Sequence, residues 1–298
     1  MKNKYILYNP HANNGRGEEQ ARELEKKLAG SKAILVKMTD ISDYADFIAD
    51  IDGSDELIIC GGDGTLNRFI NDTSMLELAN SVYYYPAGSG NDFACDIGAS
   101  KDGDLMCIDK YLADVPHVFV NGMERIFLNG VGYGVDGYCC EVGDELRRKS
   151  NKPVNYTSIA IKGLLFHYRR ANATVTVDGD TREYKGVWIA PTMNGRFYGG
   201  GMMPTPAQDR LDSEGKLSLM IFHRSGKLRT LMIFPSIFKG EHVKNTKFVE
   251  VLEGKDITVR FDRPTALQID GETVLGVTEY RAVSGKTANI KQAEAVTV

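Results

Sequence analysis

A glycine-rich turn between an apolar strand and a helix constrains this sequence more than any other feature. The run GGDGTLN at residues 61–67 directly follows the strand-like Leu57–Cys60 and leads into helical spacing. Glycines at three of the first four positions let the backbone turn sharply and approach a bulky anion. The N–H groups at the start of the next helix suit phosphate, and Thr65 can cap that helix or contact a phosphate oxygen. Taken alone, the turn fits a tight strand-to-helix connection as well as it fits a ligand site.

Two further polar turns follow strands in the same part of the chain. PAGSGNDFA at residues 86–94 comes after Val82–Tyr85, and NPHANNGRG at residues 9–17 comes after Tyr5–Tyr8. The carboxyl ends of parallel strands meet at one edge of a sheet, where folds of this kind bind ligands. Three glycine-containing turns converging on one edge therefore predict a nucleotide site.

Two other phosphate-binding patterns do not fit the sequence. A GxxxxGK[ST] loop is missing, because Ser284–Thr287 has Tyr280 where the upstream glycine should stand, and we interpret this segment as a hairpin turn. A GxGxxG motif with a ribose-binding acid about 20 residues further on is also missing.

Strands and helices alternate in the first third of the chain, which predicts an α/β domain with a parallel, Rossmann-like sheet. From about residue 117, short strands between Gly/Asp turns predict a mainly antiparallel β-sandwich. We therefore predict a nucleotide-binding domain at residues 1–116 and a second domain at 117–298, whose last residues can return to the first. The other expected strands are Ile34–Met38, Glu56–Cys60, Val118–Asn121, Arg125–Leu128, Ala173–Val177, Val187–Ala190, Lys216–Phe222, Phe248–Leu252, Ile257–Phe261, Ala266–Ile269, Val277–Val283 and Ala288–Lys291. The expected helices are Gly17–Leu28, Tyr44–Ile51, Leu66–Leu78, Asn155–His167 and Leu228–Phe238.

Composition excludes several classes of protein. The net charge of −4 does not indicate a generally basic nucleic-acid-binding surface. We expect no secretory signal after Met1, and no window approaches the roughly 18 apolar residues of a transmembrane helix. The five cysteines lack CxxC spacing and a nearby histidine, so we expect reduced thiols in a cytoplasmic protein and no zinc site.

In their order, the motifs resemble the diacylglycerol kinase catalytic-domain family, which includes bacterial soluble lipid kinases and the related sphingosine and ceramide kinases. Residues 61–67 are similar to the family's signature, and residues 9–15 and 86–94 are similar to its opening turn and its G-T-x-N-D-F-A segment. Further similar segments are FLNGVGYGVD at 127–136, GGG at 199–201 followed by Pro206-Ala207, and DGE at 270–272. The resemblance covers nearly the whole chain and implies a fold of the NAD kinase and diacylglycerol kinase type.

The resemblance implies an enzyme that uses ATP and Mg²⁺ to phosphorylate a lipid hydroxyl. It implies that the nucleotide is held by Asn9, Thr39, Gly61, Gly62, Asp63, Gly64, Thr65, Leu66, Asn67 and Ser89. It also implies that Asp63 and Asp92 belong to the charged network around Mg²⁺ and that Asp270 is the general base, assisted by Glu272.

The sequence departs from the family pattern in three places. The family's structural magnesium loop, A-x-x-x-D-G-x-L, corresponds to residues 207–217, where one extra residue leaves open whether Asp212 or Glu214 is the carboxylate ligand beside Leu217. Arg68 stands where the family usually has Glu, and asparagines fill positions 13 and 14, where glycine is common. The last two changes bear on substrate identity and leave the catalytic carboxylates in place.

The resemblance implies a diacylglycerol-like substrate, a product such as phosphatidic acid, and a cytoplasmic protein that is transiently peripheral to a membrane. The cations at residues 147–149, 152 and 169–170 fit either lipid headgroups or an ordinary solvated face. One alternative is a NAD kinase-like enzyme, which shares the GGDGT turn but lacks the GSGNDFA segment. The other is a non-catalytic lipid or nucleotide sensor, against which the intact Asp63, Asp92, Asp270 and Glu272 argue. A homodimer is left open, and no nucleic-acid partner is expected.

Overall fold

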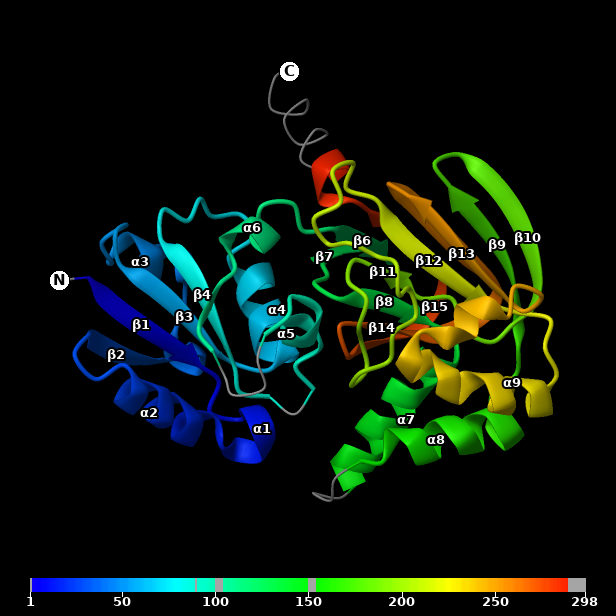
Figure 1. Cartoon of the computed structure of the whole chain (residues 1–298), viewed down its shortest axis with the longest axis horizontal. Helices are drawn as coiled ribbons and strands as arrows, with labels where there is room; N and C mark the ends of the chain where they lie inside the picture. Colours follow the sequence, from blue (N-terminus) through cyan, green and yellow to red (C-terminus); the bar gives the residue numbers. More distant parts are fainter. Residues whose placement is uncertain (1, 89, 100–103, 150–153, 289–298) are drawn as a thin grey trace. The chain divides into compact units, whose positions relative to one another are not determined.

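The computed structural model describes residues 2–88, 90–99, 104–149 and 154–288. The chain divides into two compact units, Met1–Ala113 and Asp114–Val298 (Figure 1). The first unit is α/β and the second is a mainly antiparallel β-sandwich, which confirms the predicted fold class. The first unit ends at Ala113, three residues before the end of the domain predicted at 1–116. The prediction that the last residues return to the first domain falls on 289–298, which lie outside the described residues.

The first unit is built on a five-stranded sheet with the order β2-β1-β3-β4-β5. Strands β1 to β4 are parallel, and the short β5 is antiparallel to β4. The strands are β1 (Asn3–Tyr8), β2 (Lys32–Lys37), β3 (Glu56–Gly61), β4 (Ser81–Pro86) and β5 (Met106–Cys107). The helical segments are α1 (Ala12–Gly15), α2 (Gly17–Lys27), η1 (Met38–Asp40), α3 (Tyr44–Ala49), α4 (Asp63–Asp72), α5 (Asp92–Asp96) and α6 (Asp109–Leu112).

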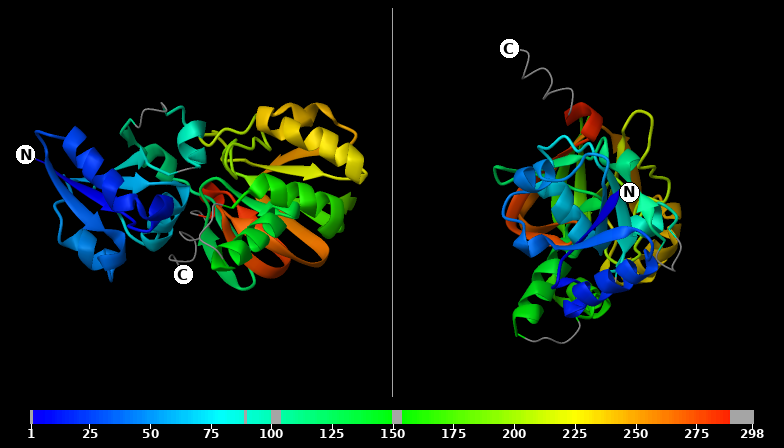
Figure 2. Two further views of the ribbon diagram at one scale, coloured as in Figure 1. Left: turned by 90° about the horizontal axis from the view of Figure 1, so that it is seen from below. Right: turned by 90° about the vertical axis from the view of Figure 1, so that its left-hand side faces the viewer.

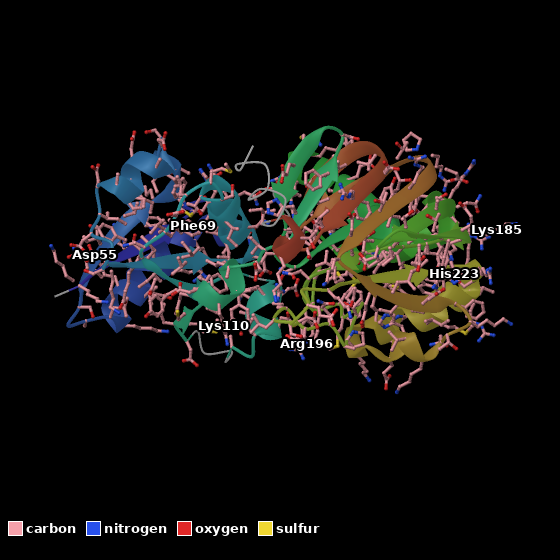
Figure 3. The ribbon with its side chains drawn as sticks, turned by 90° about the horizontal axis from the view of Figure 1, so that it is seen from above. Asp55, Phe69, Lys110, Lys185, Arg196 and His223 are labelled. Carbon is pink, nitrogen blue, oxygen red and sulfur yellow. The ribbon has the colours of Figure 1, made fainter. Side chains whose placement is uncertain are left out.

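The central strands of this sheet are buried on both faces. On one face Ile6 and Ile58 pack with Leu24 of α2, and on the other Phe69 of α4 is buried and meets the ring of Tyr44. Such continuous apolar runs are typical of parallel sheets covered by helices on both sides. Figures 2 and 3 show these layers, and Figure 3 labels Phe69.

The register of the strands brings their carboxyl ends level. Tyr8 of β1 pairs with Cys60 of β3, and Gly61 of β3 pairs with Pro86 of β4. The turns after β1, β3 and β4 therefore leave the sheet at the same edge, as the parallel alternation predicts.

The second unit contains a ten-stranded antiparallel sheet whose main path runs β13-β12-β11-β8-β14-β15-β6-β7. Strand β9 pairs with β14, and β10 pairs with β9, so the sheet branches at β14. The strands are β6 (His117–Val120), β7 (Met123–Ile126), β8 (Gly130–Tyr133), β9 (Ala171–Val177), β10 (Asp180–Val187), β11 (Thr192–Met193), β12 (Leu217–Phe222), β13 (Val249–Gly254), β14 (Asp256–Ile269) and β15 (Glu272–Val283).

Two apolar cores stabilise the second unit. One lies between the strands and includes Tyr133 stacked on Phe261 at 3.9 Å between ring centroids. The other lies where the helices cover the sheet and includes the fully buried Trp188. The helical segments are α7 (Val135–Lys149), α8 (Tyr156–Lys162), η2 (Gly163–His167), α9 (Lys227–Ile233), η3 (Phe234–Lys239) and η4 (Glu241–Lys244).

The helix predicted at Leu66–Leu78 is wrong at both ends. It begins earlier, at Asp63, in the glycine-rich turn itself. It ends at Asp72, because the hydroxyl of Thr73 donates to the carbonyl of Phe69 at 2.8 Å and competes with helix continuation.

Helix α7 has 15 residues and was missed by the sequence analysis. Gly137 and Gly143 lower its helix propensity, but both are required by packing. A Cβ on Gly137 would lie 2.0 Å from the carbonyl oxygen of Ala266, and one on Gly143 would lie 2.6 Å from the ring of Tyr156.

Three further predictions in the second unit are wrong in detail. The strand expected at Val187–Ala190 is not continuous, because β10 ends at Val187 and Ile189 forms only isolated bridges. The two strands expected within 257–269 are one strand, β14, whose pairing with β15 shifts register near Thr265. A helical turn at 285–288 replaces the hairpin turn expected at 284–287 and the first residue of the strand expected at Ala288–Lys291, whose other residues lie outside the described part of the chain.

Candidate functional site

Two of the glycine-rich turns at the edge of the first sheet touch each other through their backbones. A Cβ on Gly88 would lie 2.4 Å from the Cα of Gly62, and one on Gly62 would lie 3.0 Å from the Cα of Gly88. The N–H of Ala87 donates to the carbonyl of Gly61 at 2.8 Å. Glycine is therefore required at positions 62 and 88 for the turns to pack, before any ligand is considered.

Asp63 links the same two turns. Its Oδ2 accepts a hydrogen bond from the N–H of Asp92 at 2.7 Å, and its Oδ1 accepts one from the N–H of Phe93 at 3.0 Å. These are the first amides of α5, which an acidic side chain stabilises. Asn91 closes the turn in a left-handed conformation, with its Oδ1 accepting from the N–H of Gly88 at 3.0 Å. The carboxylate predicted to sit near Mg²⁺ thus holds the turn together, and Asp92 beside it is buried.

Gly64 differs from its neighbours because none of the residues that the structure describes fills the space beside it. A Cβ built there meets no atom within 4 Å, and Gly64 lies in the first turn of α4. The first turn of a helix presents N–H groups that have no partner within the helix, together with the positive end of the helix dipole. This position can therefore be approached closely by an anionic group such as phosphate.

The opening turn at residues 9–17 is also held by close local contacts. The Oδ1 of Asn9 accepts from the N–H of His11 at 3.0 Å, and a Cβ on Gly17 would lie 1.9 Å from the carbonyl oxygen of Asn9. The next residues, Asn13 and Asn14, are left-handed with φ of 49° and 57°. Asparagine tolerates this region better than other residues with a Cβ, so it can replace the glycine common in the family pattern.

The remaining residues predicted to bind the nucleotide divide into two groups. Thr39 is exposed in η1, directly after β2. Thr65, Leu66 and Asn67 are buried: Thr65 folds over Gly61, Leu66 is 0% exposed, and Asn67 accepts a hydrogen bond from Asn71. Their side chains face the interior and Gly61 is buried as well, so only Gly62, Asp63 and Gly64 of the 61–67 segment are accessible. Ser89 lies outside the described residues.

In the second unit, Asp270 lies in the turn between β14 and β15 with a left-handed φ of 45°. Its Oδ1 accepts from the N–H groups of Asn129 and Gly130 at 2.8 and 2.9 Å, and its Oδ2 accepts from the N–H of Leu128. Three amide donors stabilise the negative charge of the carboxylate and occupy most of its lone pairs. The predicted general base is therefore also a structural link between β14 and the strand β8.

Glu272 opens β15 and forms an ion pair with Arg125 of β7 at 2.5 Å. Its side chain is 55% exposed, so this pair contributes little to stability. Glu272 remains predicted to assist Asp270, but its carboxylate is directed to Arg125.

The predicted structural metal loop uses its acidic groups in local contacts. The Oδ1 of Asp212 accepts from the N–H groups of Glu214 and Lys216 at 3.0 Å each, and the bond from Lys216 is the main cause that lowers the pKa of Asp212. The Glu214 carboxylate pairs with the ammonium of Lys216 at 3.0 Å, and Leu217 is buried at the start of β12. In the described ranges no group of three or more His, Cys, Asp or Glu side chains is arranged to hold a metal. These residues do not fit a divalent-ion site as they stand.

Asp136 is a candidate that the sequence analysis did not select, although it ends the 127–136 motif. Burial raises its pKa to about 7. Its Oδ2 accepts from the hydroxyl of Tyr198 at 3.2 Å, and its Oδ1 has no hydrogen-bond partner among the residues that the structure describes. A buried carboxyl with a shifted pKa is typical of functional sites. Gly132, in the same sequence motif, makes room for this carboxyl, since a Cβ there would lie 1.8 Å from Asp136 Oδ2.

A cavity of about 400 Å³ lies in the second unit, between β14, β15, α7 and the end of η2. Its lining combines aromatic rings with arginines and includes Tyr138, Tyr168, Arg169, Arg263 and Leu275. The size lies near the lower end for small-molecule sites. None of the predicted site residues lines this cavity.

Known families match both units. Residues 3–115 match the family described as "Diacylglycerol kinase catalytic domain", and residues 129–287 match "YegS C-terminal NAD kinase beta sandwich-like domain". The chain is 26% identical to "Putative lipid kinase YtlR" of Bacillus subtilis, over 95% of this chain and 97% of that protein. It is 26% identical to "Putative lipid kinase SAR0780" of Staphylococcus aureus, over 92% of this chain and 93% of that protein.

A solved structure shares the fold. The crystal structure of a "putative diacylglycerol kinase" from Bacillus anthracis superposes with a TM-score of 0.68, at 19% identity over 95% of this chain and 92% of that one. In the described parts of the chain, no helix combines the length and the apolar character needed to cross a membrane.

Proposed function

Because this chain belongs to the diacylglycerol kinase family, with that family's catalytic domain followed by the YegS-type sandwich domain, we propose that it transfers the γ-phosphate of ATP to a lipid hydroxyl. The acceptor we propose is diacylglycerol or a similar lipid, and the product is a phospholipid such as phosphatidic acid. The family supports a lipid kinase over the NAD kinase-like alternative and over a sensor without activity.

The observation that carries the proposal is the pair of interlocked turns with open space at Gly64. The contact between Gly62 and Gly88 and the bonds from Asp63 to α5 fix the turns without a ligand. The first turn of α4 beside them is left accessible, as a phosphate-binding backbone must be. A site that is ordered beforehand loses little entropy when the nucleotide binds.

Phosphoryl transfer requires the protein mainly to position its reactants and to neutralise charge. In the proposed reaction the turns of the first unit hold the triphosphate, and Mg²⁺ would supply compensation of phosphate charge when bound. Asp63 and Asp92 would contribute negative charge near that ion, although the oxygens of Asp63 already accept two amide bonds. Asp270 of the second unit would accept the proton of the lipid hydroxyl as the new bond forms.

We also propose that the protein reaches its lipid as a peripheral membrane protein, through the face formed by η2 and α9. Leu228 and Met232 lie four residues apart on α9 and are 76% and 67% exposed, and Phe166 of η2 is 73% exposed. The two elements are joined by a bond from Lys227 Nζ to the carbonyl of Leu165 at 2.6 Å. Helical residues four apart share one face, so these side chains can enter a lipid surface together.

The charge around this face supports an anionic lipid surface. Residues 154–171 and 223–240 contain no Asp or Glu, although the whole chain is acidic. Exposed cations in these two segments are Lys162, Arg169, Arg170, Arg224, Lys227, Arg229 and Lys239. Cations beside exposed apolar side chains are typical of proteins that bind anionic membranes.

Of the cations at 147–149, 152 and 169–170, Arg169 belongs to this face, and those that already have a partner are less suitable. Arg147 pairs with Asp144, Lys149 pairs with Glu145, and Arg170 donates to the carbonyl of Ser225 at 2.8 Å. Lys152 lies outside the described residues.

The test is a kinase assay with radiolabelled ATP on mixed micelles that contain diacylglycerol, a monoacylglycerol, ceramide or sphingosine in separate reactions, with NAD as a further acceptor. Transfer to a lipid supports the proposal, and transfer to NAD alone supports the NAD kinase-like alternative. Binding of ATP without transfer to any acceptor would favour the sensor and overturn the kinase proposal.

A further inference from the structure

The predicted metal loop already contains a cation, the ammonium group of Lys286. Its Nζ donates to the carbonyl of Ser213 at 2.8 Å and lies 3.4 Å from the carbonyl of Asp212. The aliphatic part of the side chain crosses Gly215, where an added Cβ would lie 3.1 Å from Lys286 Cδ. Gly215 has a left-handed φ of 73°, so the loop presents a bare backbone to the lysine.

Lys286 is held in place by its own backbone. It lies in the helical turn after β15, where the N–H groups of Thr287 and Ala288 donate to the carbonyl of Ser284 at 3.0 Å each. The N–H of Ser284 donates to the carbonyl of Lys255 at 2.8 Å. Gly285 packs so closely that a Cβ would lie 2.2 Å from the carbonyl carbon of Asp114. The ammonium therefore reaches the loop from a fixed position.

Each acidic group of the loop already has a partner. Asp209 Oδ1 accepts from the N–H of Leu211 at 2.9 Å, and Asp212 Oδ1 accepts the two backbone bonds described above. Glu214 pairs with Lys216. A Mg²⁺ ion requires oxygen ligands at roughly 2.0–2.1 Å in near-octahedral geometry. An ion bound to the carbonyls of Asp212 and Ser213 would also lie within a few ångströms of the Lys286 ammonium and be repelled by it.

We propose that Lys286 is the structural cation of the 209–216 loop and that this loop folds without the divalent ion that the family resemblance implies for it. On this inference the extra residue in the loop and the lysine at position 286 belong together, because the lysine takes the place of the ion. This inference does not depend on the proposed reaction, because it concerns the folded loop alone.

The loop bears on the proposed catalytic region through Arg210. Its guanidinium donates to the carbonyl of Leu128 and to the Oδ1 of Asn129. The amides of these two residues also donate to Asp270. The loop that Lys286 contacts therefore also carries the arginine that contacts the neighbours of Asp270.

The test compares Lys286→Met with Lys216→Met in the full-length protein without nucleotide. Methionine keeps the apolar stem of Lys286 and removes only the ammonium. Lys216 is the matched control, because it lies in the same loop and only pairs with the exposed Glu214. Hydrogen exchange of a peptide covering 209–217, thermal unfolding, and metal content by mass spectrometry are measured before and after dialysis against EDTA.

We expect the wild-type protein to contain substoichiometric Mg²⁺ and Ca²⁺ and to keep its melting temperature and its exchange pattern after EDTA. Lys286→Met should speed exchange of the amides of Glu214, Gly215 and Lys216 by about tenfold, because a bond from a charged donor is lost. Lys216→Met should leave the exchange of Glu214 and Gly215 near the wild-type rate. One bound divalent ion per chain, faster loop exchange after EDTA, or equal exchange in the two variants would overturn the inference.

Discussion

Replacement of Asp270 by Asn tests the proposed base. The structure predicts that this substitution also lowers the stability of the folded protein. Asparagine fits the left-handed backbone at this position as well as aspartate does. Its amide, however, has one acceptor oxygen where the carboxylate has two. If that oxygen keeps the N–H groups of Asn129 and Gly130, the NH₂ group faces the N–H of Leu128, which is left without an acceptor.

The magnitude follows from these bonds. An unsatisfied amide costs about 1–3 kcal/mol, and the two remaining bonds lose their charge assistance, so the free energy of unfolding should fall by about 3 kcal/mol. For a domain of this size 1 kcal/mol corresponds to about 2–4 °C, which gives a decrease of about 6–12 °C in melting temperature. If Asp270 is also the base, kcat should fall by at least about 100-fold.

The assay separates the two effects by temperature. Lipid kinase turnover is measured well below the melting temperature of Asp270→Asn, with circular dichroism confirming the folded state. Glu272→Gln is the matched control in the same turn, since it loses only an exposed pair with Arg125 and should change stability by less than about 1 kcal/mol. The thermal shift caused by Mg²⁺-ATP should persist in both variants, because the nucleotide is proposed to bind the other unit.

Two outcomes would refute the reasoning at different points. A folded Asp270→Asn protein with near wild-type kcat would show that Asp270 is not the base, which must then be sought at Asp63 or Asp92. An unchanged melting temperature would show instead that the three amide bonds do not stabilise the unit.

Three further predictions concern the nucleotide site, a buried carboxyl and the membrane face. Gly64→Ala should leave the melting temperature unchanged or slightly raised, because alanine favours the helix, but should abolish the thermal shift by Mg²⁺-ATP. Gly62→Ala should cost about 1–3 kcal/mol by pressing on the neighbouring turn. An equal nucleotide shift in Gly64→Ala and wild type would move the phosphate site elsewhere. Burial raises the pKa of Asp136 to about 7, against about 3.9 in the unfolded chain. The protonated carboxyl therefore contributes fully to stability below about pH 4, and this contribution is lost as the pH rises to about 7. The free energy of unfolding should fall over this range by at most about 4 kcal/mol. Asp136→Asn should therefore flatten the fall in urea midpoint between pH 5 and 8, and the same fall in both proteins would contradict this. Leu228→Asp should weaken sedimentation with anionic vesicles, whereas Met75→Asp in the other unit should not, although Met75 is even more exposed (86% against 76%). Equal loss in both would argue against the η2–α9 face.

The sequence predicted the layers of the fold because those depend on periodicity, but it could not predict how the glycines are used. Strand β3 is apolar from Leu57 to Cys60 and leads into a glycine-rich turn, so the parallel sheet and its ligand edge follow from local pattern. Helix α7 was missed because Gly137 and Gly143 weaken the local helical signal and are explained only by contacts with β14 and Tyr156. Asp270 was selected by motif, yet its three amide donors come from residues about 140 positions away in sequence. No local pattern reveals such a contact.

The glycine-rich turn illustrates why a motif alone cannot separate structure from function. Three of its four first residues are glycines, but the structure requires them for different reasons. Gly61 makes room for Thr65 and Gly62 makes room for Gly88, whereas a Cβ on Gly64 would meet none of the described residues within 4 Å. At a helical position where a side chain would fit, glycine contributes nothing to packing and lowers the helix propensity. Among these glycines, Gly64 is therefore the one whose presence calls for a ligand, and it is where the proposed phosphate contact should be tested first.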